Sequence, residues 1–579
     1  MKLAEALKIL QAASSREAEK FNVYLACGIL PLHLTTFLAA HLSKRLPERA
    51  IEIRTGLYGD LAGNLVQLQK SSAHAGAVVI EWSDLDPRLG LRRLGGWGPS
   101  ILPDIHAGVQ LALNQLLQLL GSCSQSVPLA LCLPNLPLPP ISHQPRDQSG
   151  LDTLLLEKSL YDFAATAAQI PHVKLVNRQR LDTASPIFER LDVKSELSTG
   201  FPYRTAHASK LAELLSDLIV PRTPKKGLIT DLDDTLWRGL LGEDGVDGIS
   251  WDLDRHSHIH ALYQQTLCAL SESGVLLGIS SKNDPERVTE ALNRQDLLLP
   301  KDRFFPIEVN WNSKSESVDR ILKVWNISAD AVVFVDDSPL ELAEVKTIYP
   351  GIECLRFPID DEQGAYDLLE KLRDLFGKQE IVEEDVIRVA SLRSGVEFQQ
   401  HAKSDSAQPL EAFLGQLEAE LTLSPVPAGD ARALELVNKT NQFNLNGRRL
   451  NEAEFQYALN RRGAVSLLVS YTDKYGPLGK IAVLLGEVSA NVLKIDTWVM
   501  SCRAFSRRIE DRCLQYLFES LDISEIELDL QPTTRNGPIR DFLAKFVNAE
   551  LTSSLRIQRE SFMSTKPTLS HKINEASYV

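Results

Sequence analysis

Residues 227–237 read GLITDLDDTLW, an apolar run that ends in three closely spaced carboxylates. The apolar residues predict a buried strand, and a polar cluster directly after such a strand lies at the carboxyl edge of a parallel sheet, where α/β proteins usually build their sites. Asp231 and Asp233 stand two residues apart at this point. Their spacing suits a magnesium ion with a phosphoryl group, because Mg²⁺ prefers oxygen ligands and keeps several waters. This stretch therefore predicts an α/β domain with its chemistry at the sheet edge.

Three further polar segments follow along the chain in the order that such a site needs. They are residues 278–284 (GISSKND), 310–315 (NWNSKS) and 334–341 (FVDDSPLE). A single DxDxT match is more often a surface turn than a site. Four segments in this order favour the site.

The two carboxylates of the first segment can take different chemical roles. Asp231 can attack phosphorus to form an aspartyl phosphate, while Asp233 can protonate the leaving oxygen and later activate water. Ser281 is a candidate hydrogen-bond donor to a phosphoryl oxygen. Lys314 is a candidate for neutralising the charge that develops during transfer, an electrostatic role that often contributes several kcal/mol.

The same segments supply candidate ligands for metal and substrate. Mg²⁺ is the expected cofactor. Lys282 is either a ligand-contacting residue or only a solvated loop residue beside the site. The candidate metal ligands are Asp231, Asp233, Asp336 and Asp337, and the candidate substrate-binding residues are Thr235, Lys282 and Asn283.

Length and composition limit the classes of protein that fit. With 579 residues, the chain is too long for one hydrophobic core, and the prediction is an α/β protein of several domains. A net charge of -14 gives no support to a nucleic-acid partner, and the chain has no apolar run of bilayer length. Seven cysteines without zinc spacing, and an amphipathic N-terminus in place of a secretion signal, predict a cytoplasmic protein with reduced thiols.

Short apolar runs alternate with helical patterns on both sides of the central block. The Pro-rich stretch 133–145 is expected to be a loop after the third N-terminal strand, where it either borders a cleft or is only a long connection. The C-terminal alternation predicts a mixed sheet with flanking helices. The expected divisions are an α/β domain over 1–220, the catalytic block over 221–360, a charged helical connector over 361–420 and a third domain over 421–579.

The four central segments resemble the motifs of the haloacid dehalogenase superfamily. Residues 231–239 (DLDDTLWRG), continuing to 242–245 (GEDG), look like its FkbH-like branch. The resemblance implies a Rossmann-like central domain between an SGNH-hydrolase-like domain and a GNAT-like α+β domain. The supporting outer motifs are 25–28 (LACG) and 56–60 (GLYGD) for the first, and 437–445 (VNKTNQFNL) and 495–503 (IDTWVMSCR) for the second.

By this resemblance, the chain would take a glyceryl unit from 1,3-bisphosphoglycerate, remove its phosphate and load it as a thioester onto an acyl carrier protein in polyketide biosynthesis. Many relatives carry cysteine where Ser280 stands, so Cys502 is the remaining thioester candidate, although it can equally be a core residue. Cys27 and Gly28 stand where a nucleophilic serine would follow the first strand. The N-terminal domain is therefore interpreted as a scaffold or a carrier-docking domain.

Two other functions stay open at this point. One is a magnesium-dependent phosphatase of a small phosphorylated metabolite, which needs the Asp231 and Asp233 pair but no carrier. The other is a non-catalytic interaction protein whose central site is vestigial. The presence of both aspartates together with Lys314 and Asp337 argues against the second.

Overall fold

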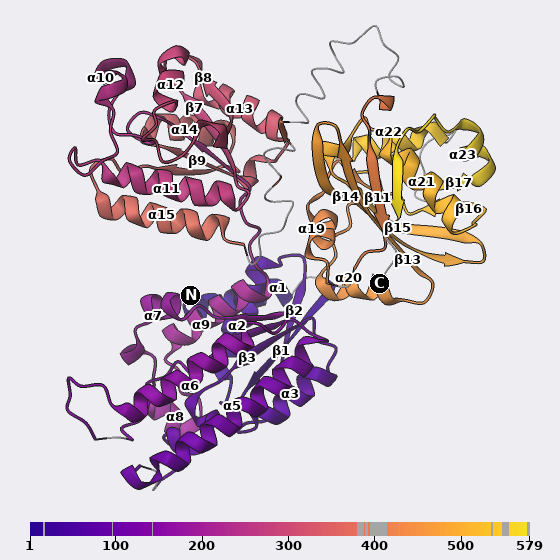
Figure 1. Cartoon of the computed structure of the whole chain (residues 1–579). Helices are drawn as coiled ribbons and strands as arrows, with labels where there is room; N and C mark the ends of the chain where they lie inside the picture. The colour runs from indigo at the N-terminus through magenta and orange to yellow at the C-terminus, as the bar shows by residue number, and fades with distance from the viewer. Residues whose placement is uncertain are drawn as a thin grey trace. The chain divides into compact units, whose positions relative to one another are not determined.

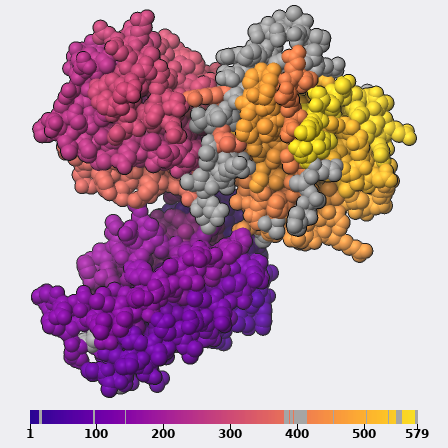
Figure 2. All heavy atoms as spheres, viewed as in Figure 1, coloured from indigo at the N-terminus to yellow at the C-terminus, as the bar shows by residue number. Residues whose placement is uncertain are grey.

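The computed structural model describes residues 1–14, 18–94, 97–141, 143–378, 387, 392–393, 414–427, 429–533, 536–546 and 555–575. The chain divides into two compact units, Met1–Thr223 and Pro224–Val579. The first unit appears as one continuous body of indigo to purple spheres (Figure 2). Three sheets with flanking helices make up the described fold (Figure 1). The predicted α/β class is confirmed.

The first unit is built on a parallel five-stranded sheet in the order β2-β1-β3-β4-β5. Its strands are β1 (Lys20–Cys27), β2 (Ala50–Thr55), β3 (Ala75–Val79), β4 (Leu129–Cys132) and β5 (Val173–Leu175). Its helices are α1 (Leu3–Ser14), α2 (Leu32–Arg45), α3 (Leu61–Lys70), α4 (Trp82–Leu85), α5 (Leu102–Ser124), α6 (Leu151–Ala167), α7 (Arg178–Ala184), α8 (Val193–Thr199) and α9 (Thr205–Ile219).

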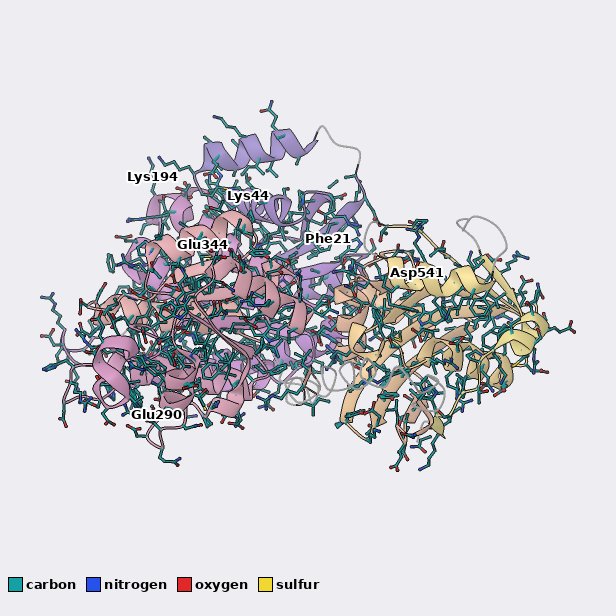
Figure 3. All side chains as sticks on the ribbon, turned by 90° about the horizontal axis from the view of Figure 1, so that it is seen from above. Phe21, Lys44, Lys194, Glu290, Glu344 and Asp541 are labelled. Carbon is teal, nitrogen blue, oxygen red and sulfur yellow. The ribbon has the colours of Figure 1, made fainter. Side chains whose placement is uncertain are left out.

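Helices cover both faces of this sheet. Side chains of α3, α5 and α6 pack on one face, and those of α1, α2 and α9 pack on the other. Lys44 of α2, labelled in Figure 3, pairs with Glu5 of α1 at 2.9 Å. β3 (AGAVV) is buried along its whole length, as expected for a parallel strand that is covered on both faces.

The second unit contains the sheet predicted around residues 227–237. It is parallel and five-stranded, in the order β10-β9-β6-β7-β8. Helices α11, α12 and α15 cover one face, and α13 and α14 cover the other. The strands are β6 (Gly227–Thr230), β7 (Leu276–Ser281), β8 (Phe304–Val309), β9 (Val332–Asp336) and β10 (Glu353–Arg356). The helices are α10 (Leu241–Gly248), α11 (His258–Glu272), α12 (Pro285–Leu292), α13 (Lys314–Trp325), α14 (Pro339–Ile348) and α15 (Glu362–Phe376).

The same unit carries a mixed eight-stranded sheet in the order β17-β16-β15-β14-β13-β11-β18, with β12 paired to β15. Its strands are β11 (Glu420–Ser424), β12 (Phe443–Asn444), β13 (Ala464–Asp473), β14 (Gly476–Ser489), β15 (Val492–Met500), β16 (Glu525–Leu528), β17 (Leu555–Gln558) and β18 (Lys572–Glu575). Its helices are α19 (Ala431–Lys439), α20 (Glu452–Asn460), α21 (Ile509–Ser520), α22 (Gly537–Leu543) and α23 (Arg559–Thr565).

The division into domains at 220, 360 and 420 stays a prediction. Within the expected connector, α15 is described, and most of residues 379–413 lie outside the described residues. In the described parts of the chain, no helix combines the length and the apolar character needed to cross a bilayer.

Candidate active site

The predicted site residues lie where three neighbouring strands end. β6 lies between β7 and β9, and all three run parallel. Asp231 directly follows β6, Ser281 is the last residue of β7, and Asp336 is the last residue of β9. Because the carboxyl ends of parallel strands share one edge, this register brings the three segments together. Lys314 is the first residue of α13, where the Ser313 side chain caps the helix by accepting a bond from Glu316 N.

Lys314 is the centre of a buried charge cluster. Its Nζ lies 2.6 Å from Asp231 Oδ1, 3.1 Å from Asp336 Oδ2 and 3.2 Å from Glu341 Oε2. The same atom donates a hydrogen bond of 2.7 Å to the carbonyl oxygen of Ser280. With only 2% of the side chain exposed, this ammonium group is held by its three acidic partners rather than by water.

The pKa shifts follow from this arrangement. Burial favours a neutral lysine, but Asp231, Asp336 and Glu341 together raise the pKa of Lys314 above its ordinary value. Burial also opposes ionisation of Glu341, but Lys314 and Lys282 lower the pKa of that carboxyl. For Asp336, burial raises the pKa to about 7 against the pull of Lys314. Lys314 therefore carries a fixed positive charge next to Asp231.

Asp233 is held in a different environment. Its Oδ1 accepts a hydrogen bond of 3.0 Å from Trp237 Nε1, and its Oδ2 accepts one of 3.0 Å from Asn283 Nδ2. Burial, followed by the charges of Asp231 and Asp234, raises its pKa, although Trp237 lowers it. A carboxyl group with a raised pKa is suited to give a proton to a leaving oxygen.

Asp337 offers a carboxylate that faces negative charge. Burial, with added repulsion from Asp231 and Asp234, raises the pKa of Asp337 to about 6, and the effect of Lys314 on it is weaker. By contrast, Asp336 has both oxygens engaged, one by Lys314 and the other by Ser338 N at 2.9 Å. The negative charges of Asp337, Asp231 and Asp234 are thus only partly offset by Lys314.

Carboxylate oxygens of Asp231, Asp336 and Glu341 also lie within 4.8 Å of one another, a separation that a metal ion could bridge. The Lys314 ammonium group already sits within 3.2 Å of each of these carboxylates. A divalent cation in the same place would meet that positive charge at close range. Asp337 is therefore the better candidate as a second ligand beside Asp231, because burial and repulsion from neighbouring aspartates raise its pKa and Lys314 offsets this only weakly.

The remaining predicted residues line the same edge. Ser281, Thr235 and Asn283 are buried, and Thr235 Oγ1 has no hydrogen-bond partner among the described residues. Lys282 is one-third exposed and pairs with Glu341 Oε1 at 2.9 Å. The side chain of Cys502, which follows β15, lies outside the described part of the structure.

Sequence patterns did not assign two residues that matter here. Glu341 bridges Lys282 and Lys314, and Trp237 positions Asp233. The position of Glu341, in the first turn of α14 directly beyond the aspartate pair, could have pointed to it. Trp237 reads as core in the sequence, because only its ring nitrogen reaches the site.

No family model matches the chain, and no curated protein matches it. Among solved structures, the chain resembles the N-terminal part of a Bacteroides fragilis protein that contains a phosphatase domain and was crystallised with Mg, with a TM-score of 0.51 and 18% identity over 66% of this chain and 100% of that one. A fungal multi-domain β-N-acetylglucosaminidase with a glucosamine N-acetyltransferase region aligns over 94% of this chain and 66% of its own at 11% identity, but its TM-score of 0.16 is too low to indicate a common fold. Over the 66% of this chain that aligns, the first likeness shows a fold shared with that phosphatase-containing structure.

Proposed function

We propose that the chain is a magnesium-dependent phosphoryl-handling enzyme of the haloacid dehalogenase type. The observation that carries this proposal is the Lys314 ammonium group, held by Asp231 and Asp336 beside an Asp233 carboxyl that two hydrogen bonds orient. A structural core does not require a buried lysine among three carboxylates, because buried ion pairs add little net stability.

The proposed reaction uses the two aspartates in turn. A carboxylate oxygen of Asp231 attacks phosphorus, the bond to the leaving oxygen breaks, and Asp233 gives its proton to that oxygen. Asp233 then takes a proton from water, the resulting hydroxide attacks the aspartyl phosphate, and inorganic phosphate leaves with the Asp231 carboxylate restored. The raised pKa of Asp233 supports the first role, and Lys314 offsets the negative charge near Asp231 throughout.

Asp231 and Asp337 are the side chains that would hold Mg²⁺, since Asp336 is committed to Lys314 and Ser338. When bound, the ion would neutralise charge on the phosphoryl oxygens. The Bacteroides fragilis structure was crystallised with Mg, which supports Mg²⁺ as the ion.

The FkbH-like motifs extend the proposal to substrate and partner. The substrate is a phosphorylated C3 unit derived from 1,3-bisphosphoglycerate, and the acceptor is the thiol of an acyl carrier protein in polyketide-type biosynthesis. Cys502 is the proposed site of an intermediate thioester, and the first unit is proposed as a scaffold or carrier-docking domain.

Intact-protein mass spectrometry tests both levels of the proposal. Full-length chain is incubated with Mg²⁺, 1,3-bisphosphoglycerate and a phosphopantetheinylated carrier protein, and compared with Asp231→Asn. Asp302→Asn serves as a matched control, because Asp302 is exposed and precedes β8 at the opposite edge of the sheet. We expect a glyceryl adduct on the carrier with wild type and control but not with Asp231→Asn. Phosphate release without an adduct would leave a plain phosphatase. If the wild-type chain forms neither phosphate nor an adduct, the enzyme proposal is contradicted.

A further inference from the structure

The first unit contains a cavity of about 300 Å³. Residues that follow β1, β3 and β4 line it: Ile29, Trp82 and Leu136 are one from each. In the sheet, β2 and β3 lie on opposite sides of β1, so the chain reverses its direction of winding here. Crevices at the carboxyl ends of strands beside such a reversal are where open α/β sheets bind ligands, and the volume falls at the low end of small-molecule sites.

The wall of the cavity is mostly aliphatic. The Pro-rich loop after β4 supplies residues 136–140, and the segment after α4 supplies residues 89–91. α8 adds Val193 and Glu196. The Pro-rich stretch therefore borders a cavity, which is one of the two alternatives that its sequence left open.

The loop that forms this wall is fixed by buried hydrogen bonds. Glu81 accepts bonds from Asn135 Nδ2 at 2.7 Å, from the Tyr203 hydroxyl at 2.6 Å and from Leu136 N at 3.3 Å. Trp82 Nε1 donates to the carbonyl oxygen of Leu136 at 3.1 Å. Because these bonds lie within the protein, the cavity keeps its shape without a ligand. Glu81 already accepts three hydrogen bonds within the protein, so a ligand is not required to satisfy it.

Glu196 is different, because one of its oxygens is unused. Its Oε1 lies 3.6 Å from Arg92 Nε, which is too far for a strong hydrogen bond. Its Oε2 is buried and has no hydrogen-bond partner among the described residues. A buried acceptor without a partner costs free energy, and a ligand donor would recover it. The cavity thus combines a mostly aliphatic wall with the carboxylate of Glu196.

We propose that this cavity binds a neutral, mainly aliphatic molecule that carries a hydroxyl or amide N–H donor at one end. The aliphatic part would replace water along the leucine and proline wall, and the donor would bond to the Glu196 carboxylate, which lines the cavity. An aliphatic carboxylate would be rejected, because its charge would meet the Glu196 carboxylate in a poorly hydrated space. This site lies wholly in the first unit and does not depend on the proposed phosphoryl chemistry.

Calorimetric titration of the full-length chain tests the proposal, with 1-octanol as the neutral probe and octanoate as its anionic counterpart. Val193 lines the cavity and is 49% exposed, so Val193→Trp is expected to fill or block it. The matched control is Leu197→Trp, one turn further along α8, where the side chain is 55% exposed and does not line the cavity. Lys194, labelled in Figure 3, lies on the same helix.

We expect saturable binding of 1-octanol, at least tenfold weaker binding in Val193→Trp, and binding within twofold of wild type in Leu197→Trp. Octanoate should bind at least tenfold more weakly than 1-octanol to wild type. Glu196→Gln should narrow that ratio to less than threefold, because the amide can donate to a carboxylate. Unchanged binding in Val193→Trp, equal loss in Leu197→Trp or equal affinity for both probes would each overturn the proposal.

A labelling experiment covers the case in which Val193→Trp does not fold. An aliphatic alcohol that carries a diazirine is photolysed with the wild-type chain, and the labelled peptides are identified by mass spectrometry. The site is supported if excess 1-octanol suppresses the labelling of residues 136–140 or 191–196. Suppressible labelling only elsewhere refutes it.

Discussion

Replacing Lys314 with methionine removes the charge from the active-site cluster while keeping a side chain of similar length. Its Nζ contacts three carboxylates at 2.6, 3.1 and 3.2 Å, and each contact near 3 Å corresponds to an attraction of roughly 5 kcal/mol at an effective dielectric constant of about 20. Desolvation and repulsion among the carboxylates offset much of this sum. Breaking a buried ion pair from one side destabilises a protein by about 3–5 kcal/mol, and we expect that range here.

Urea unfolding of the full-length chain, followed for the second unit, measures the loss of stability. Lys323→Met is the matched control, because Lys323 lies on the same helix, is 75% exposed and pairs with the partly exposed Asp319, so its loss should cost less than about 1 kcal/mol. Phosphate release in the Lys314→Met chain should fall by a factor of about 10²–10³ where folded protein remains.

A double-mutant cycle with Asp336→Asn isolates the contact between Lys314 and Asp336. We expect a coupling energy of about 0.5–3 kcal/mol, because each single change leaves a buried partner without its counterion. A coupling energy near zero, together with destabilisation no larger than that of Lys323→Met, would refute the charge cluster as described.

Three further outcomes are expected. Trp237→Phe removes the hydrogen bond to Asp233 Oδ1, so kcat should fall by about tenfold or more with little change in KM, which steady-state phosphate release measures. Chelation of divalent cations should abolish phosphate release and added Mg²⁺ should restore it; Asp337→Asn should need more Mg²⁺ for half-maximal rate, whereas an unchanged requirement would exclude Asp337 as a ligand. Burial raises the pKa of Glu81 from 4.5 to about 8, so the unfolded chain releases this proton at lower pH than the folded chain, and stability of the first unit should fall as pH rises through that interval. Unfolding of Glu81→Gln should lack this part of the pH dependence, and an identical pH profile would contradict the assignment.

Central strands could be predicted from the sequence because a parallel strand covered on both faces reads as a continuous apolar run. β6, β7 and β9 are such runs, and the polar residues at their ends lie together as expected. In the two parallel sheets, the strands that the patterns did not single out are β2, β8 and β10, and all three are at sheet edges. β2 alternates apolar with charged residues, and β8 contains Pro306, which an edge strand tolerates.

The candidate site was predictable as a set of residues but not as a set of contacts. Lys314, Asp231 and Asp336 were identified from their segments, whereas the sequence grouped Asp336 with Asp337 as metal ligands. Only the fold separates these neighbours, since Asp336 is fully buried against Lys314, whereas the pKa of Asp337 is raised by burial and by repulsion from Asp231. The bridge from Glu341 to Lys282 likewise depends on how α14 meets the end of β7, which no local pattern specifies.

Acid-quenched peptide mapping can detect the proposed aspartyl phosphate on Asp231 itself. The wild-type chain is mixed with Mg²⁺ and an acyl phosphate, quenched within the first turnover and digested, and the peptide that contains residues 227–237 is analysed by mass spectrometry. We expect one phosphoryl group on Asp231, absent in Asp231→Asn and longer-lived in Asp233→Asn, which lacks the general base for hydrolysis. Phosphate release from the wild type, with no phosphorylated Asp231 in any of these chains, would contradict this proposal.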